Sequence, residues 1–180
     1  MGNKTSISKF ALQYGILFGI IMILEFVIGY ILNIDPTTNQ SFGVIISVLN
    51  YFILPAILIY VACNAYKTKF NNGFISFSQC LKIGVTICVI AGLLYGLFSA
   101  TFGMMFPEYF EEMMKKMRIV MRDKNPQMTS EQIDMAITMS KKFMNPVISI
   151  PITVIMYAFI GLLISLIIGA IVKKDPNQSI

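Results

Sequence analysis

The stretch PEYFEEMMKKMRIVMRDKNPQMTSEQIDMAITMSKKFMN, residues 107–145, divides one apolar block from three others. It carries 8 of the 13 methionines of the chain, together with 7 basic and 6 acidic residues. Charge of this density is too costly for the hydrocarbon of a bilayer, whereas each apolar block is long enough to cross about 30 Å of it as a helix. The blocks comprise residues 10–32, 42–63, 81–106 and 147–172.

The composition excludes an ordinary soluble domain. The chain of 180 residues is 56% hydrophobic and only 13% charged, and its mean hydropathy is +0.73. Soluble domains carry roughly 25% charged residues. Long apolar runs satisfy their own backbone in lipid as helices, and the alternating pattern of a membrane β-barrel is absent. We therefore predict an all-α integral membrane bundle of four transmembrane helices, a single domain over residues 1–180 that is surrounded by the lipid bilayer.

Basic residues outside the long stretch indicate the orientation. Seven lie on one side of the predicted membrane against a single acid, Asp175, whereas the long stretch nearly balances its charges. Because short cytoplasmic loops are enriched in Lys and Arg, we expect both termini in the cytoplasm and residues 107–145 in the periplasm. The seven are Lys4, Lys9, Lys67, Lys69, Lys82, Lys173 and Lys174.

Residues 107–145 have the pattern of two amphipathic helices. Pro107 suits the first turn of a helix in which acidic residues come first and basic residues follow, as the helix dipole favours. The run Asp123–Pro126 ends this helix, and Thr129 with Gln132 has capping-box spacing at the start of the next. We predict an extramembrane amphipathic helical hairpin between spans three and four.

The apolar side of the hairpin is rich in methionine, an adaptable residue at promiscuous binding surfaces. We predict that this face docks a protein partner or a second copy of the chain. Packing of the stripe on the other helix of the hairpin, on the bundle or on the membrane surface is the simpler alternative. Thioethers also bind Cu(I), but the chain has no histidine, and we expect no metal site. The predicted face comprises Phe110, Met113, Met114, Met117, Met121, Met139 and Phe143.

Glu25 is the one acid inside a predicted span. At 1.5 Å per residue it lies about 12 Å below the outer end of the first helix. Neighbouring spans place Asn50, Ser99 and Thr153 at a similar depth. Without a cation nearby, desolvation favours a protonated carboxyl. Two interpretations remain open: a proton or cation site, or a hydrogen bond to Asn50 or Thr153 that pins the bundle.

Small residues recur at a spacing of four in the first, third and fourth spans, which predicts close helix packing in a membrane. Pro55 lies well inside the second span and predicts a kink. Ser76 and Gln79 have capping-box spacing at the start of the third span. The small residues are Gly15, Gly19, Gly92, Gly96, Ala100, Gly161, Ser165 and Gly169.

Three motifs carry a resemblance to a known family: GFISFSQCLKIG at 73–84, PEYFEE at 107–112 and SEQI at 130–133. With them the chain resembles, over nearly its whole length, a family of small four-span membrane proteins of Bacteroidetes that is classed as a domain of unknown function. The resemblance implies a bacterial inner-membrane location. It implies no catalytic residues.

The sequence lacks the usual arrangements of an enzyme site: a nucleophile beside a base, a phosphate-binding loop or a cluster of metal ligands. We predict a protein that is not an enzyme, needs no cofactor and binds no nucleic acid. The favoured function is a membrane accessory or interaction protein that uses the methionine-rich hairpin. The alternative is a small proton- or cation-linked transporter or channel subunit that uses Glu25.

Overall fold

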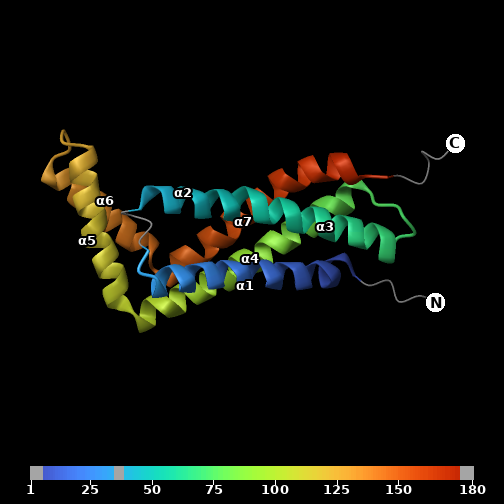
Figure 1. Ribbon diagram of the computed structural model, residues 1–180, viewed down its shortest axis with the longest axis horizontal. Coiled ribbons are helices and arrows are strands. Elements are labelled where there is room, and N and C mark those ends of the chain that lie inside the picture. The colour runs from blue at the N-terminus through green and yellow to red at the C-terminus, as the bar shows by residue number, and fades with distance from the viewer. Residues whose placement is uncertain (1–5, 35–38, 175–180) are drawn as a thin grey trace.

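The computed structural model describes residues 6–34 and 39–174, which form an all-α bundle with an elongated shape (Figure 1). Four helical segments are long and apolar enough to cross a membrane. The prediction of a four-helix membrane bundle is therefore confirmed. Three spans are single helices, α1 (Ile7–Ile31), α4 (Phe77–Met105) and α7 (Pro146–Val172), and the second, Gln40–Lys69, is built from three segments.

The second span contains a π-helical segment. It runs through α2 (Gln40–Val48), the π-helix η1 (Leu49–Ile53) and α3 (Leu54–Lys69). The backbone N–H of Leu54 bonds to the carbonyl of Leu49, five residues earlier. Because Pro55 has no N–H to donate, the regular ladder is interrupted at this point, and the wider turn absorbs the interruption. At the place where the sequence predicted a kink, the structure has a π-helix that ends two residues before Pro55.

Helix α4 lies at the centre of the bundle, packed along α1 on one side and α7 on the other, while α3 packs on α4 and α7. Glycines allow these close approaches. A Cβ built on Gly161 would lie 2.8 Å from Cys88 Cβ, and one on Gly92 would lie 2.9 Å from Tyr157 Cβ. A Cβ on Gly15 would lie 2.8 Å from that of Ile90. The predicted small-residue packing surfaces are therefore present at the helix contacts.

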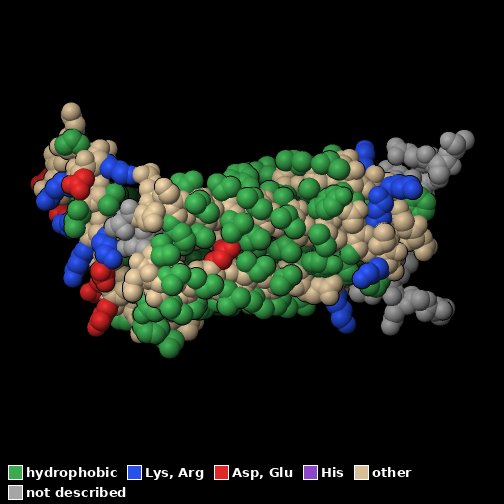
Figure 2. Space-filling model, viewed as in Figure 1, with side chains coloured by type: hydrophobic (Ala, Val, Ile, Leu, Met, Phe, Trp, Pro, Cys, Tyr) green, Lys and Arg blue, Asp and Glu red, His purple; other side chains and the backbone are tan. Residues whose placement is uncertain are grey.

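Both ends of the described chain lie at one end of the bundle (Figure 1). Ile75 and Lys174 exchange two backbone hydrogen bonds of 3.1 and 2.9 Å, which tie the loop before α4 to the residues after α7. Ser76 and Gln79 form the predicted capping box at the start of α4. On the face shown in Figure 2, the described residues at this end of the bundle display basic side chains and no acidic ones.

The hairpin consists of α5 (Pro107–Lys124) and α6 (Ser130–Phe143), which lie at the opposite end of the bundle, with α5 running across it (Figure 1). The capping box predicted for Thr129 and Gln132 is present. Met114 packs with Ile133 and Ile137 in a small core between the two helices. This core gives the hairpin a hydrophobic interior that is separate from that of the bundle.

Candidate intramembrane site

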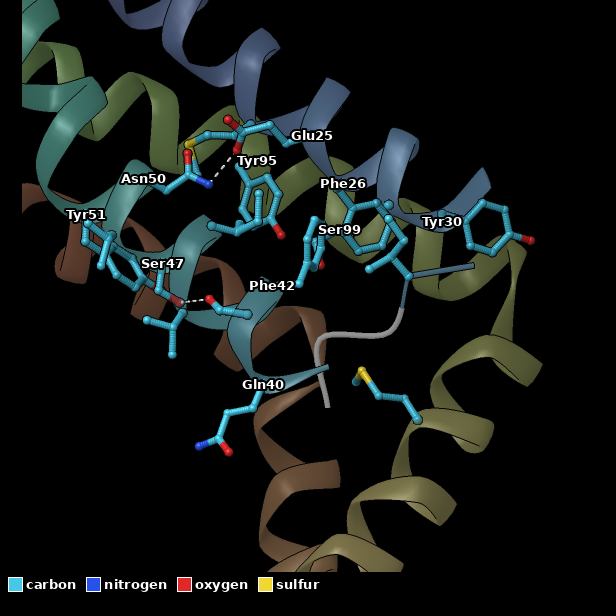
Figure 3. Close-up of a pocket in the computed structure, with 18 of the residues that line it drawn as sticks. Glu25, Phe26, Tyr30, Gln40, Phe42, Ser47, Asn50, Tyr51, Tyr95 and Ser99 are labelled. Atoms are coloured by element: carbon cyan, nitrogen blue, oxygen red, sulfur yellow. Dashed lines mark hydrogen bonds between the residues drawn. The ribbon is translucent and has the colours of Figure 1, made fainter. Parts of the chain in front are cut away.

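A cavity of about 690 Å³ lies at the hairpin end of the bundle, between α1, α2, η1, α4 and α5 (Figure 3). Helices α1 and α4 pack closely, but α2 makes its main contact with η1 alone. The wider π-helical turn lies where the second span leaves the packed part of the bundle. The space between α2 and its neighbours is the cavity.

Glu25 and Asn50 are the polar centre of this cavity. Asn50 Nδ2 donates a hydrogen bond of 2.6 Å to Oε2 of Glu25, across from η1 to α1. Asn50 is buried, and its Oδ1 accepts no hydrogen bond from any residue that the structure describes. A buried polar atom left unpaired costs about 1–3 kcal/mol. The pair therefore retains hydrogen-bonding capacity that the described protein does not use.

The rest of the lining is apolar, aromatic or uncharged. Among the residues that the structure describes, Glu25 is the only charged side chain of the lining. Tyr95 and Ser99 of α4 line the cavity, as does Tyr51 of η1. Figure 3 shows Tyr95 beside the Glu25–Asn50 pair. A mostly apolar cavity with a few convergent polar groups is the usual form of a small-molecule site.

Three of the four residues predicted for an intramembrane site come together here: Glu25, Asn50 and Ser99 all line the cavity. Thr153 does not. Its carbonyl oxygen instead lies 3.3 Å from the position of a Cβ on Gly92, in the contact between α4 and α7. The predicted hydrogen bond of Glu25 is therefore made with Asn50.

The cavity faces the hydrophobic flank of the bundle. Figure 2 shows an acidic side chain in the middle of this flank, surrounded by apolar ones. Glu25 is the only acid within the four spans and is partly exposed. The helix segments beside it carry exposed apolar side chains such as Val48 and Phe52, which suit contact with lipid. The polar pair is thus accessible from the side of the bundle.

Helix α5 closes the cavity at its outer end. Tyr109, Phe110 and Met113 belong to the lining. The ring of Tyr109 lies edge-on to that of Tyr30, with centroids 5.2 Å apart, and also meets Phe26 at 6.1 Å. Edge-to-face pairs of this kind stabilise contacts by about 0.5–1.5 kcal/mol beyond their buried area. The hairpin therefore forms the roof of the cavity through aromatic contacts.

The seven residues predicted as a partner-binding face do not form one surface. Met114 is buried between α5 and α6, and Met113, Met117 and Met121 pack against the same core. Phe110 faces the cavity. Only two members of the set are exposed, Met139 and Phe143 of α6.

Counting depth along antiparallel helices brought together three of the residues that line the cavity, and it placed Tyr51 close to them. No signal in the sequence pointed to Tyr95, which is one of 8 tyrosines in the chain. Among the described residues, no three His, Cys, Asp or Glu side chains lie together as a metal site would require.

Comparison with known proteins identifies one family. A family model described as "Protein of unknown function (DUF4199)" matches residues 13–174. No curated protein and no solved structure matches the chain significantly.

Proposed function

This chain belongs to the DUF4199 family of proteins of unknown function, and we propose that it is a non-catalytic membrane protein that binds amphipathic organic cations at Glu25. The cation exchanges with a proton at this carboxyl, as in the small transporter subunit that the sequence suggested as an alternative. The proposed setting is a bacterial inner membrane, with both termini in the cytoplasm and the hairpin in the periplasm.

One observation carries the proposal: among the described residues, the Glu25 carboxyl is the only charged group that lines a cavity of about 690 Å³ in the membrane-spanning part of the bundle. Cavities of about 300–1,000 Å³ hold drug-sized ligands. An ionised carboxyl within a membrane is costly unless a cation accompanies it. No Lys or Arg belongs to the described lining, so either a proton or the ligand has to neutralise Glu25.

The surrounding rings favour an organic cation over a hydrated inorganic ion. Phe26, Tyr51, Tyr95 and Tyr109 all line the cavity. Aromatic faces attract alkylammonium and related cations by about 0.5–2 kcal/mol each. The apolar walls also suit the hydrocarbon part of such a ligand, since removal of each methylene from water is worth about 0.8 kcal/mol, whether into the bilayer or into the cavity.

Competition between the proton and the ligand for Glu25 determines how the affinity for the cation changes with pH. Where Glu25 is protonated, binding of a cation releases one proton, so the affinity rises with pH up to about tenfold per pH unit. The other ionisable side chains of the described lining are tyrosines. They comprise Tyr30 of α1, Tyr51 of η1, Tyr95 of α4 and Tyr109 of α5.

Binding of tetraphenylphosphonium to the purified protein in nanodiscs tests the proposal. We expect saturable binding that strengthens with pH and is abolished in Glu25→Gln. Glu112→Gln is the matched control, because Glu112 lies on α5 and pairs with Lys116 at 3.0 Å, outside the cavity. Equal binding by the wild type and Glu25→Gln would reject the proposal, as would an affinity that is independent of pH.

The interaction function first favoured from the sequence has weaker support. It relied on a continuous methionine-rich face, and four of those methionines pack within the hairpin.

The proposed orientation in the membrane has its own test. A membrane-impermeant maleimide applied to intact cells should label a cysteine at Asn125, between α5 and α6, and leave one at Lys69 unmodified.

A further inference from the structure

We propose that α6 is an interfacial helix, whose exposed apolar stripe lies in the boundary between the lipid head groups and acyl chains. The stripe consists of Met135, Met139 and Phe143, which are 67, 55 and 55% exposed. This inference concerns the outside of the hairpin and does not depend on what the cavity binds.

The three residues lie on one side of the helix, because a spacing of four residues advances by about 40° around it. The opposite side meets α5 through Ile133 and Ile137, which are buried. Exposed polar residues occupy the face between, among them Asp134, whose carboxylate pairs with Arg118 of α5 at 2.6 Å. Helix α6 is therefore apolar on two separate sides, and the hairpin core accounts for only one of them.

The position of the stripe identifies the bilayer as its partner. Phe143 lines a cavity of about 410 Å³ in the corner between the end of α4 and the start of α7, together with Met104. The Phe143 end of the stripe thus faces the side of the hairpin on which the spans lie. Helices α5 and α6 lie at the hairpin end of the bundle (Figure 1), and the proposal places α6 along the membrane surface there.

Exposed apolar residues also lie at the adjoining ends of the spans. Met104 and Met105 at the end of α4 are 71 and 68% exposed, and Val147 in the first turn of α7 is 80% exposed. These residues belong to helices that the bilayer surrounds. An interfacial helix typically buries such a face about 5–10 Å into the boundary region and keeps its charged face in water.

The charges in the last turn of α6 agree with this placement. Lys141 and Lys142 lie in that turn, shortly before the fourth span begins. Their ammonium groups can reach lipid phosphates while their methylene stems lie on apolar surface. Together these features describe a helix lying on the membrane rather than one that projects into water.

Site-specific fluorescence tests the placement. A nitrobenzoxadiazole label is attached to Met139→Cys or, as the matched control, to Thr138→Cys, in nanodiscs with acyl-brominated lipids or with iodide in the buffer. Thr138 is exposed and neighbours Met139, but points about 100° away around the helix. The native cysteines Cys63, Cys80 and Cys88 are fully buried, so the introduced thiol is the one labelled.

We expect the label at 139 to be quenched by brominated lipids and protected from iodide, and the label at 138 to show the reverse. Quenching of both labels by iodide would overturn the proposal, because α6 would then project into water. Protection of 139 from both quenchers would also overturn it, in favour of a protein partner or second copy. Met135→Cys, on the same stripe, repeats the measurement should Met139→Cys fold poorly.

Discussion

Lys124 Nζ donates a 2.7 Å hydrogen bond to Gln40 Oε1, joining residues 84 positions apart. Lys124 is the last residue of α5 and Gln40 the first of α2. Helix α5, which closes the outer end of the cavity, is thus attached at its C-terminal end to α2, which forms one wall of the cavity. The outer half of the second span, which packs little on the other spans, is held in part by this contact.

A cross-link between these helices is the first prediction. A short cysteine-reactive bis-maleimide should join Lys124→Cys to Gln40→Cys within one chain, because the hydrogen bond brings these side chains together. The same reagent should not join Lys115→Cys to Gln40→Cys, since Lys115 lies more than two turns earlier on α5. Mobility on a denaturing gel reports the product. Equal yields from the two pairs would show that the hairpin does not lie across the bundle in this way.

Removal of the amide that faces Glu25 should destabilise the bundle. Asn50→Ala deletes the 2.6 Å hydrogen bond between η1 and α1, and interhelical hydrogen bonds in membranes contribute about 0.6–2 kcal/mol. Asn64→Ala is the control, because Asn64 bonds only to the carbonyl of Tyr60 in its own helix. Unfolding in sodium dodecyl sulfate, followed by circular dichroism, measures the difference. A smaller loss for Asn50→Ala than for the control would contradict the assigned contact.

Gly161→Ala should lower stability by about 1–3 kcal/mol, the usual cost of overpacking. The new Cβ would lie 2.8 Å from Cys88 Cβ and 2.9 Å from the carbonyl oxygen of Gly84. Because the Gly84 oxygen belongs to the backbone of α4, it cannot shift as easily as the end of a flexible side chain. Gly96→Ala is the matched control in the same helix contact, because its Cβ would lie 3.5 Å from the Cα of Ile150. The same unfolding assay compares them, and equal stability of the two variants would refute the packing.

Thr129→Ala should loosen α6 without affecting the spans. Thr129 Oγ1 accepts from the N–H of Gln132, and Gln132 Oε1 accepts from that of Thr129. Loss of such a cap typically costs about 1 kcal/mol. Faster amide hydrogen exchange in α6 alone is the expected readout. Thr138→Ala, inside the helix, should leave the exchange of the first turn unchanged, and an equal effect of both variants would argue against the cap.

Local signals account for the part of the fold that the sequence predicted. The spans follow from uninterrupted apolar length, and the helix starts at Thr129 and Ser76 follow from capping chemistry that operates within four residues. The cavity depends on contacts that no local signal encodes. Pro55 predicts an irregular turn but not its direction, and depth along a helix does not specify which way a side chain points. For this reason Asn50 was correctly placed beside Glu25 and Thr153 was not.

The spacing of the methionines also does not specify what they contact. A methionine stripe on α5 indicates that one face of the helix is apolar, but not which element packs against that face. Helix α6 carries two apolar faces. Met114 and its neighbours pack on the inner face of α6, whereas Met139 lies on the outer one. Only the path of the hairpin across the bundle distinguishes a methionine in a small core from one on a membrane surface.

The lateral position of Glu25 changes how selectivity would arise. A ligand that enters from the flank of the bundle has already left water, and its hydrocarbon tail has gained about 0.8 kcal/mol per methylene by partitioning into the bilayer. Transfer from lipid into an apolar cavity adds little to that gain. Chain length then governs how much ligand accumulates in the membrane, while the head group that meets Glu25 and Asn50 governs which of the accumulated molecules is retained.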